Sequence, residues 1–264
     1  MIAGVAKGVG SFLAGIGSPV VGMASHVGGL ATLLARTVRA LFPPRFDLPE
    51  LWRNLYKMGN QSVPIVLLTA FFVGGIMIVQ AAVFVQRFGA TSMVGWGAGY
   101  SVLREIGPIL IALMFSGRVG SNNTAELGTM VVTEQIDGLR ALSIDPIRYL
   151  IVPRILSMMI MLFLLTVLGD LVALTGAGIF GRIMIGIDLA IYYNGIVNDI
   201  GLGDLFHGLI KSVFFGGIIA LNSCHFGLSV KGGAVGVGRA VNASVVGSAV
   251  GIVLGDYFLT YLLT

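Results

Sequence analysis

The clearest apolar stretch of the chain constrains its fold most: residues 63–86 contain no charged side chain. A helix rises about 1.5 Å per residue and needs about 20 mostly apolar residues to cross a bilayer. The rest of the chain has the same character, since 56% of its 264 residues are hydrophobic and 11% are charged. An ordinary soluble domain has about 25% charged residues. The sequence therefore predicts an all-α polytopic membrane protein.

This composition excludes several other classes of protein. So few charged residues do not suit a soluble globular enzyme, a disordered chain or a nucleic-acid-binding protein, despite the net charge of +4. One cysteine excludes a disulfide framework and a multi-cysteine metal site. The three histidines have no metal-ligand spacing, and no Ser/His/Asp or Cys/His arrangement is visible. We expect a non-catalytic chain that holds no metal and no cofactor of its own.

Four more stretches are long and apolar enough to span a membrane, which gives five spans in all. They are residues 96–117, 155–181, 205–230 and 241 to the C-terminus. Residues 8–35 are also uncharged, but their glycines, Pro19 and His26 make a weak spanning helix. We interpret this segment as interfacial. The expected division is therefore N-terminal interfacial helices over residues 1–62 and a transmembrane domain over residues 63–264.

The distribution of Lys and Arg predicts the orientation of the spans. Twelve of the 16 basic residues fall on one side: six in residues 1–62, four in the loop after the second span and two after the fourth. Cytoplasmic loops carry such an excess. We expect a cytoplasmic N-terminus and, after five spans, a C-terminus on the outer side of the membrane. Specific binding of anionic lipid is the alternative reason for the basic excess.

The loop after the second span contains an amphipathic pattern over residues 125–142. On a helix at 100° per residue, one arc would hold Glu126, Thr129, Thr133, Glu134, Asp137 and Arg140. Asp145-Pro146 should end the helix, because proline disfavours helix in the residue before it. The helix could lie passively in the headgroup layer. However, its polar face carries three acids, which suits a protein partner better than anionic lipid.

A second cytoplasmic loop is rich in glycine, from Gly232 to Arg239. Glycine-rich loops can hold phosphate groups. The chain contains no G-x-x-x-x-G-K-[ST] motif, and no strand precedes this loop. We therefore expect a tight connection between helices and no ATP hydrolysis by this chain.

Five ionisable residues lie within the predicted spans, where each costs about 2.5–3.5 kcal/mol on insertion scales. They are Arg104, Glu105, Asp170, Lys211 and Asp256. Three interpretations stay open: internal ion pairs that hold helices together, a polar cavity for a charged headgroup, and a proton relay, which the scattered positions of the acids disfavour. The sequence does not decide which cation pairs with which acid.

The last span carries small residues at steps of four, at Gly247, Gly251 and Gly255. This spacing lets helix backbones approach closely. We expect this face to pack tightly against another helix, which could belong to a second copy of the chain across a dimer axis.

Taken together, these motifs make the chain resemble the MlaE/YrbE-type permeases of bacterial ABC lipid transporters that work with MCE proteins. The resemblance covers residues 48–262. Its segments are 104–108 (REIGP), 117–120 (GRVG), 125–130 (AELGTM), 133–137 (TEQID), 145–150 (DPIRYL), 208–212 (GLIKS), the loop 232–240 and the pairs Asp256-Tyr257 and Leu259-Thr260. Such a run is far more specific than one short motif.

The resemblance implies a homodimer that sits between two cytoplasmic ABC ATPase subunits, which bind ATP and magnesium, and a periplasmic ring of MCE-domain chains. A small accessory cytoplasmic subunit would also fit. Residues 125–142 would be the coupling helix, with Glu126, Glu134, Asp137 and Arg140 facing the ATPase. Arg104, Glu105 and Lys211 would line the outward-facing lipid pathway.

The leading hypothesis is therefore the permease subunit of a transporter that moves phospholipid, or a related lipid, between the inner membrane and the outer envelope. A stand-alone secondary transporter is one alternative, and it predicts inverted repeats, which we do not find. A membrane scaffold for a periplasmic partner is another.

Overall fold

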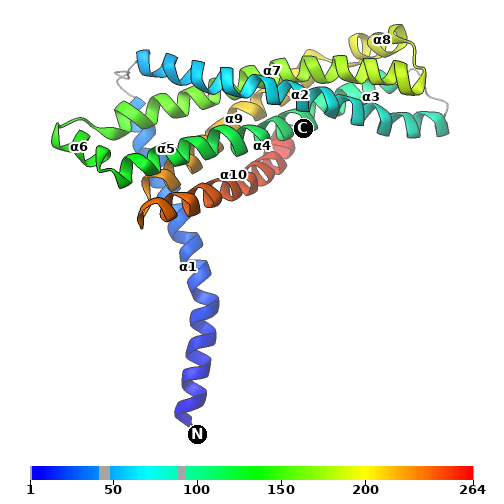
Figure 1. Cartoon of the computed structure of the whole chain (residues 1–264). Coiled ribbons are helices and arrows are strands. Elements are labelled where there is room, and N and C mark those ends of the chain that lie inside the picture. Colours follow the sequence, from blue (N-terminus) through cyan, green and yellow to red (C-terminus); the bar gives the residue numbers. More distant parts are fainter. Residues whose placement is uncertain (1, 42–47, 89–92, 264) are drawn as a thin grey trace.

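The computed structural model of the chain describes residues 2–41, 48–88 and 93–263, without the side chains of residues 2–20, 23 and 84–88. The structure is 93% helical, and the described residues form no strand. Figure 1 shows the long helices side by side, with α6 (Gln135–Ala141) at one end of the bundle and α8 (Leu189–Asp199) at the other. This confirms the all-α polytopic fold.

Five helical segments are long and apolar enough to cross a membrane, as the sequence predicts. They are Leu48–Val83, Val94–Val132, Ile147–Ile185, Leu202–Leu228 and Gly233–Leu263. In order, they consist of α2 (Leu48–Phe88); α3 (Val94–Ser101), η2 (Val102–Ile106), α4 (Gly107–Phe115), η3 (Ser116–Gly120) and α5 (Ser121–Val132); η4 (Ile147–Ile151), α7 (Val152–Phe180) and η5 (Gly181–Ile185); α9 (Leu202–Leu228); and α10 (Gly233–Leu263), where η marks a π-helical turn.

Several spanning helices are longer than the apolar stretches from which they were predicted. Helix α2 begins at Leu48 and passes through Pro64 without interruption, so the expected boundary between residues 62 and 63 falls inside a helix. Hydropathy detects only the part of a helix that suits hydrocarbon, and polar turns can continue the helix beyond it. Similarly, α10 already begins at Gly233, so the expectation of a loop from Gly232 to Arg239 is wrong for all but its first residue. The tight connection between α9 and α10 is residues 229–232.

The N-terminal helix α1 (Ile2–Leu41) meets the bundle at the end that carries α6. There the ring of His26 lies 5.8 Å from that of His225 and 5.2 Å from that of Phe226, both in α9. Within residues 1–62, where we expected interfacial helices, the described residues form α1 and the first turns of α2. Its position relative to a membrane surface stays a prediction, and the side chains of Lys7, Arg45 and Arg87 lie outside the described residues.

Helix α8 is tied to the opposite end of the bundle. Its first turn is capped by Asp188, whose carboxylate accepts a 2.9 Å hydrogen bond from the Ala190 N–H. The buried Tyr192 hydroxyl donates to the Leu174 carbonyl of α7 at 3.0 Å. Burial raises the pKa of Tyr192, so this hydroxyl stays protonated as a donor throughout the physiological range.

Helices α2 and α7 share the most extensive contact in the bundle, and small residues make it possible. A Cβ atom at Gly74 would overlap the Ala173 carbonyl oxygen, and one at Gly176 would overlap the carbonyl oxygen of Phe71. Membrane helices associate largely through such close packing, because lipid offers no hydrophobic contrast. The two backbones therefore fit only with hydrogen in place of a side chain.

The glycine face of α10 packs against α9 of the same chain. Cβ atoms built at Gly251 and Gly255 would lie 2.7 and 3.0 Å from Ile218, and one at Gly247 would lie 3.0 Å from the amide oxygen of Asn222. The close packing expected from the spacing is therefore intramolecular. The opposite face of α10 is apolar and exposed, with side chains such as Val246, Val250, Val253, Leu254, Phe258 and Leu262.

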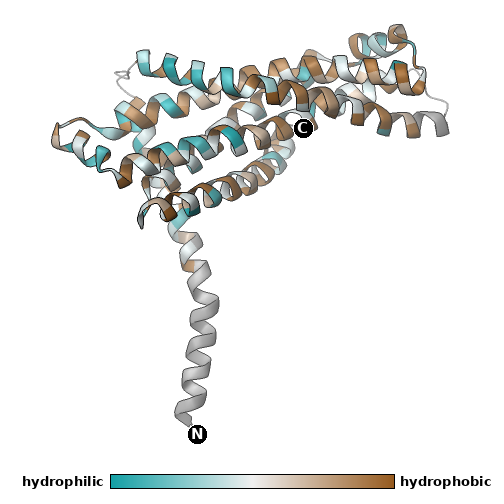
Figure 2. Ribbon diagram, in the orientation of Figure 1, coloured by the Kyte–Doolittle hydropathy of each residue, from teal (hydrophilic) through white to brown (hydrophobic). Residues whose placement is uncertain are grey.

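Hydrophilic residues gather at the α6 end of the bundle, over the first turns of α2 and over α5 and α6, whereas hydrophobic residues cover the middle of the spans (Figure 2). Most described basic residues lie on the elements of that end. The structure therefore has a polar, basic end, which suits water and lipid headgroups, and an apolar belt, which suits the hydrocarbon core of a membrane.

The α2–α7 contact yields a prediction. We expect Gly74→Ala to lower the free energy of unfolding by about 1–3 kcal/mol, because the new methyl group would overlap a carbonyl oxygen that cannot move easily. Thermal unfolding of the purified protein in detergent would measure the change. Gly97→Ala is the matched control, since a Cβ there meets nothing within 4 Å. Equal midpoints for the two variants would contradict the close approach.

Candidate functional site

A cluster of charged residues surrounds Lys211, which lies inside the membrane-spanning part of α9. Lys211 is fully buried. Its ammonium group donates hydrogen bonds to Glu105 Oε2 at 2.6 Å and to Thr260 Oγ1 at 2.8 Å, and forms an ion pair with Asp256 Oδ1 at 2.9 Å. Three helical elements, η2, α9 and α10, therefore meet at one cation.

A second pair lies beside this cluster. Arg104 Nη1 is 3.2 Å from Asp204 Oδ1, and its guanidinium carbon lies 5.3 Å from the centre of the Tyr100 ring, within reach of a cation–π interaction. Arg104 and its neighbour Glu105 thus take different partners on α9 rather than neutralising each other. Both belong to η2, and π-helical turns inside α-helices are frequent at functional sites.

These pairings answer the question that the sequence left open. Lys211 pairs with Asp256 and Glu105 but not with Asp170. With all groups ionised, the two cations and three carboxylates carry one net negative charge. In this arrangement the cations are compensated, so a phosphate group would have to replace a carboxylate at Lys211 or Arg104. The site is thus a set of exchangeable ion pairs rather than an open anion pocket.

Sequence reasoning missed Asp204 and His207, which belong to the same site. His207 is buried, and its Nε2 makes no hydrogen bond with the described residues. The fourth span was expected to begin at residue 205, so Asp204 was counted as a loop residue. The spacing of Asp204, His207 and Lys211 at i, i+3 and i+7 places them on one helix face and could have revealed the site.

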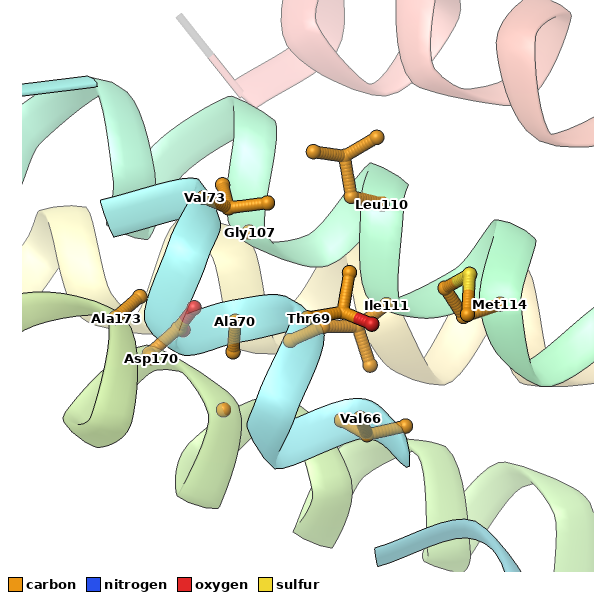
Figure 3. A pocket seen from close by; sticks show the side chains of 11 residues that line it. Val66, Thr69, Ala70, Val73, Gly107, Leu110, Ile111, Met114, Asp170 and Ala173 are labelled. Atoms are coloured by element: carbon orange, nitrogen blue, oxygen red, sulfur yellow. The ribbon is translucent and has the colours of Figure 1, made fainter. Parts of the chain in front are cut away.

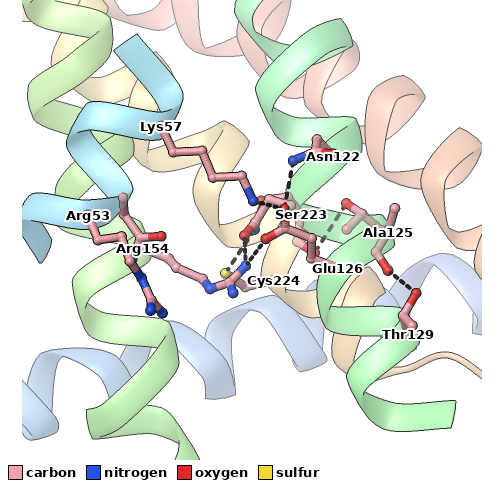
Figure 4. A network of polar contacts seen from close by, with 12 residues as sticks. Arg53, Lys57, Asn122, Ala125, Glu126, Thr129, Arg154, Ser223 and Cys224 are labelled. Carbon is pink, nitrogen blue, oxygen red and sulfur yellow. Dashed lines mark hydrogen bonds and ion pairs between the residues drawn. The ribbon is translucent and has the colours of Figure 1, made fainter. Parts of the chain in front are cut away.

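At the α6 end of the bundle, Glu126 is part of a different network (Figure 4). Its carboxylate pairs with Lys57 and accepts hydrogen bonds from Asn122 at 2.9 Å and from Arg154 at 3.3 Å. The buried Arg154 also donates to Asn123 Oδ1 at 2.6 Å. Glu126 therefore ties α5 to α2 and α7, although 33% of its side chain stays exposed. That it faces a partner together with Glu134 stays a prediction.

The expectation of a single helix over residues 125–142 is wrong, because these residues belong to two helices, α5 and α6. Helix α5 ends at Val132 as the last part of the second span, and Glu134, with φ +59°, begins a new direction before α6. Three β-branched residues, Val131, Val132 and Thr133, lower helix propensity at the break. The helical projection assumed one axis, so residues on either side of the turn do not share a face.

Helix α6 keeps an exposed, mostly acidic surface. Glu134, Asp137 and Arg140 are exposed, and Arg140 donates a 2.8 Å hydrogen bond to Asp137. Ile136 is buried and anchors the short helix to the bundle. Three of the four residues expected at a partner surface, Glu134, Asp137 and Arg140, therefore lie together on the exposed side of α6.

A groove of about 630 Å³ opens between α2, α4, α5 and α10. Its walls are apolar at Ile65, Leu113 and Met114 and polar near Arg118, whose Nε donates a 3.0 Å hydrogen bond to the Gln61 carbonyl. A surface that is apolar along one part and cationic at the other suits an amphipathic molecule.

The Lys211 cluster yields a prediction. We expect Lys211→Met to lower the free energy of unfolding by about 3–5 kcal/mol, because it leaves Glu105 and Asp256 partly buried without their cation. Combining it with Glu105→Gln and Asp256→Asn should restore most of the loss, as measured by thermal unfolding in detergent. Arg140→Met removes an exposed pair and should change stability by less than about 1 kcal/mol. A Lys211→Met protein as stable as the parent would refute the pairing.

Comparison with known proteins places these features in a family. The family model described as Permease MlaE matches residues 51–262. A protein of Rickettsia typhi named a probable ABC transporter permease is 35% identical over 86% of this chain and 87% of its own. One of the same description from Synechocystis is 41% identical over 78% of each chain. The chloroplast protein TRIGALACTOSYLDIACYLGLYCEROL 1 of Arabidopsis thaliana is 36% identical over 79% of this chain and 61% of its own. These matches confirm the resemblance seen in the motifs, and the chain belongs to the MlaE family of ABC transporter permeases.

Proposed function

We propose that this chain is the membrane subunit of a transporter that moves phospholipid, or a related lipid, between the inner membrane and the outer envelope of a bacterium. The observation that carries the proposal is the combination, in an ABC permease, of compensated charges within the spans and a separate amphipathic groove nearer the α6 end of the bundle. A lipid needs both an apolar wall and a polar group for its head. The Arabidopsis relative is named for a galactolipid, which favours the same class of cargo.

Membership of an ABC permease family implies a partner ATPase. In our proposal the ATPase binds ATP and magnesium and docks on the exposed surface formed by Glu134, Asp137 and Arg140 of α6. Because Ile136 anchors α6 to the bundle, a displacement of this turn would be transmitted to α5 and so to the second span. Residues 125–142 would thus act as a coupling element, although as two helices.

The orientation follows from the basic residues at the α6 end. Arg53, Lys57, Arg118, Arg148 and Lys231 all belong to elements of that end, which would face the cytoplasm. The N-terminal division, residues 1–62, would then lie at the cytoplasmic surface. The Lys211 cluster lies about 14 Å along α9 from Leu202 and would face the periplasmic half of the membrane.

The remaining partners are proposed from the surfaces that they would cover. The exposed apolar face of α10 would pack either against lipid or against a second copy, and we favour a homodimer with a lipid pathway between the two copies. Arg104, Glu105 and Lys211 would line that pathway. A periplasmic MCE-domain protein would receive the lipid at the α8 end, and a small accessory cytoplasmic subunit could complete the assembly.

Purification from the native membrane in mild detergent, followed by mass spectrometry, tests this assembly. We expect an ABC ATPase, an MCE-domain protein and bound phospholipid to copurify with the chain. A chain that carries the MCE-domain protein but neither ATPase nor lipid would instead support the scaffold alternative. Repeated isolation of the chain alone would contradict the proposed complex.

The α6 surface yields a functional prediction. Reversing both acids, in Glu134→Lys with Asp137→Lys, should reduce copurification of the ATPase and lipid-stimulated ATP hydrolysis by at least about tenfold, which corresponds to 1.4 kcal/mol of binding free energy. Membrane insertion should not change, because both side chains are exposed. Asp199→Lys is the control, since Asp199 is an equally exposed acid in α8 at the other end. Normal lipid transport by the double variant would refute docking at α6.

A further inference from the structure

Asp170, in the middle of α7, is an acid within the membrane that the proposed lipid pathway does not use. Its side chain is buried, with 2% of the residue exposed. Both carboxyl oxygens lack a hydrogen-bond partner among the described residues. A buried polar group without a partner is costly and calls for an explanation.

The carboxyl group points into a small cavity between α2, α4 and α7 (Figure 3). The cavity measures about 10 Å³, close to the lower limit for one water molecule. Asp170 is its only ionisable lining residue, and apart from Thr69 the other lining residues are apolar or glycine. The Thr69 hydroxyl already donates to the Ile65 carbonyl at 2.7 Å. Nothing that lines the cavity can neutralise a negative charge.

The charged groups on the helices around Asp170 are directed elsewhere. Helix α2 carries no titratable residue between Lys57 and Arg87, and α4 carries none at all. On η2 and α9, Glu105 bonds Lys211, and Arg104 bonds Asp204. The ring of His207 lies within electrostatic reach of those four groups. On α7 itself, Arg154 belongs to the Glu126 network, sixteen residues away.

An ionised carboxylate in an apolar cavity, without a cation or a hydrogen-bond donor, costs so much free energy that the group takes up a proton instead. From this geometry we propose that Asp170 is a proton-binding site within the membrane and that its carboxyl group is neutral while the cavity is closed. The ligand is a proton, with room for about one water molecule beside it.

Closure of the cavity depends on one contact in particular. Gly107, the first residue of α4, lies so close to Asp170 Oδ1 that a Cβ at this position would overlap the oxygen. The other two walls, α2 and α7, are fixed to each other by the glycine contacts described above. Movement of α4 away from them would admit water to the carboxyl group and permit its ionisation. Proton release and opening of this cavity are therefore linked.

Infrared difference spectroscopy of the full-length protein in lipid vesicles tests the proposal. We expect the carbonyl stretching band of a protonated carboxyl group near neutral pH, and its loss in Asp170→Asn. Asp256→Asn is the matched control and should leave the Asp170 band in place, because Asp256 is paired with Lys211 and makes no contact with Asp170. A carboxylate band assigned to Asp170 at neutral pH would overturn the proposal.

A second measurement needs no variant and serves if Asp170→Asn fails to fold. The carbonyl stretching band of protonated carboxyl groups can be followed in the unmodified protein as the pH is raised to neutral. The band should persist at neutral pH, and its absence there would count against the proposal. Neither readout requires transport, so failure here would be distinct from failure of the proposed function.

Discussion

The cost of an unpaired charge in the bilayer determines the arrangement of one half of this bundle, the half away from α6. Lys211 is fully buried, and acids from two other helices reach its ammonium group and compensate its charge. That requirement fixes the rotation of α9 about its axis and brings η2 and α10 beside it. Arg104 with Asp204 makes a second link between the same elements, so the position of the second span relative to the fourth is determined by charge as well as by packing.

Close backbone packing governs the other side of the bundle. Helices α2 and α7 approach through Gly74 and Gly176, where no side chain fits, and the glycine face of α10 seats on α9 in a similar way. These contacts do not depend on protonation or on a ligand. The molecule thus combines two glycine-packed helix pairs, α2–α7 and α9–α10, with a second span that contains two π-helical turns. This span is held by ion pairs and also by buried apolar side chains such as Phe115 and Leu127.

The number of spans and the residues within them that carry charge could be predicted from the sequence, because the transfer free energy of each side chain is local information. The pairing could not, since Lys211 meets acids 106 and 45 positions away along the chain, and only the packing angles of the helices decide which of them it reaches. The ion pairs of Glu126 with Lys57 and Arg154 could not be predicted for a related reason. Its place on a helical projection was correct for one straight axis, but the turn at Glu134 separates it from the exposed residues of α6. The glycine spacing of α10 predicted close packing but not that the partner helix would be α9.

The second span connects the two polar regions of the protein. Glu105 and Glu126 lie on the same continuous helical segment, 21 residues and about 32 Å apart. This one segment therefore contributes a residue to both the Lys211 cluster and the Glu126 network. Helix α6 follows this segment after a two-residue turn, at the end of the segment that faces the cytoplasm in the proposed orientation. In an ABC permease the energy of ATP hydrolysis must reach the transport pathway through the protein, and this segment provides a direct mechanical route. Its ion pairs can exchange partners, but a Cβ at Gly208 of α9 would overlap the Leu103 carbonyl oxygen of this segment, so any motion has to preserve that close backbone contact.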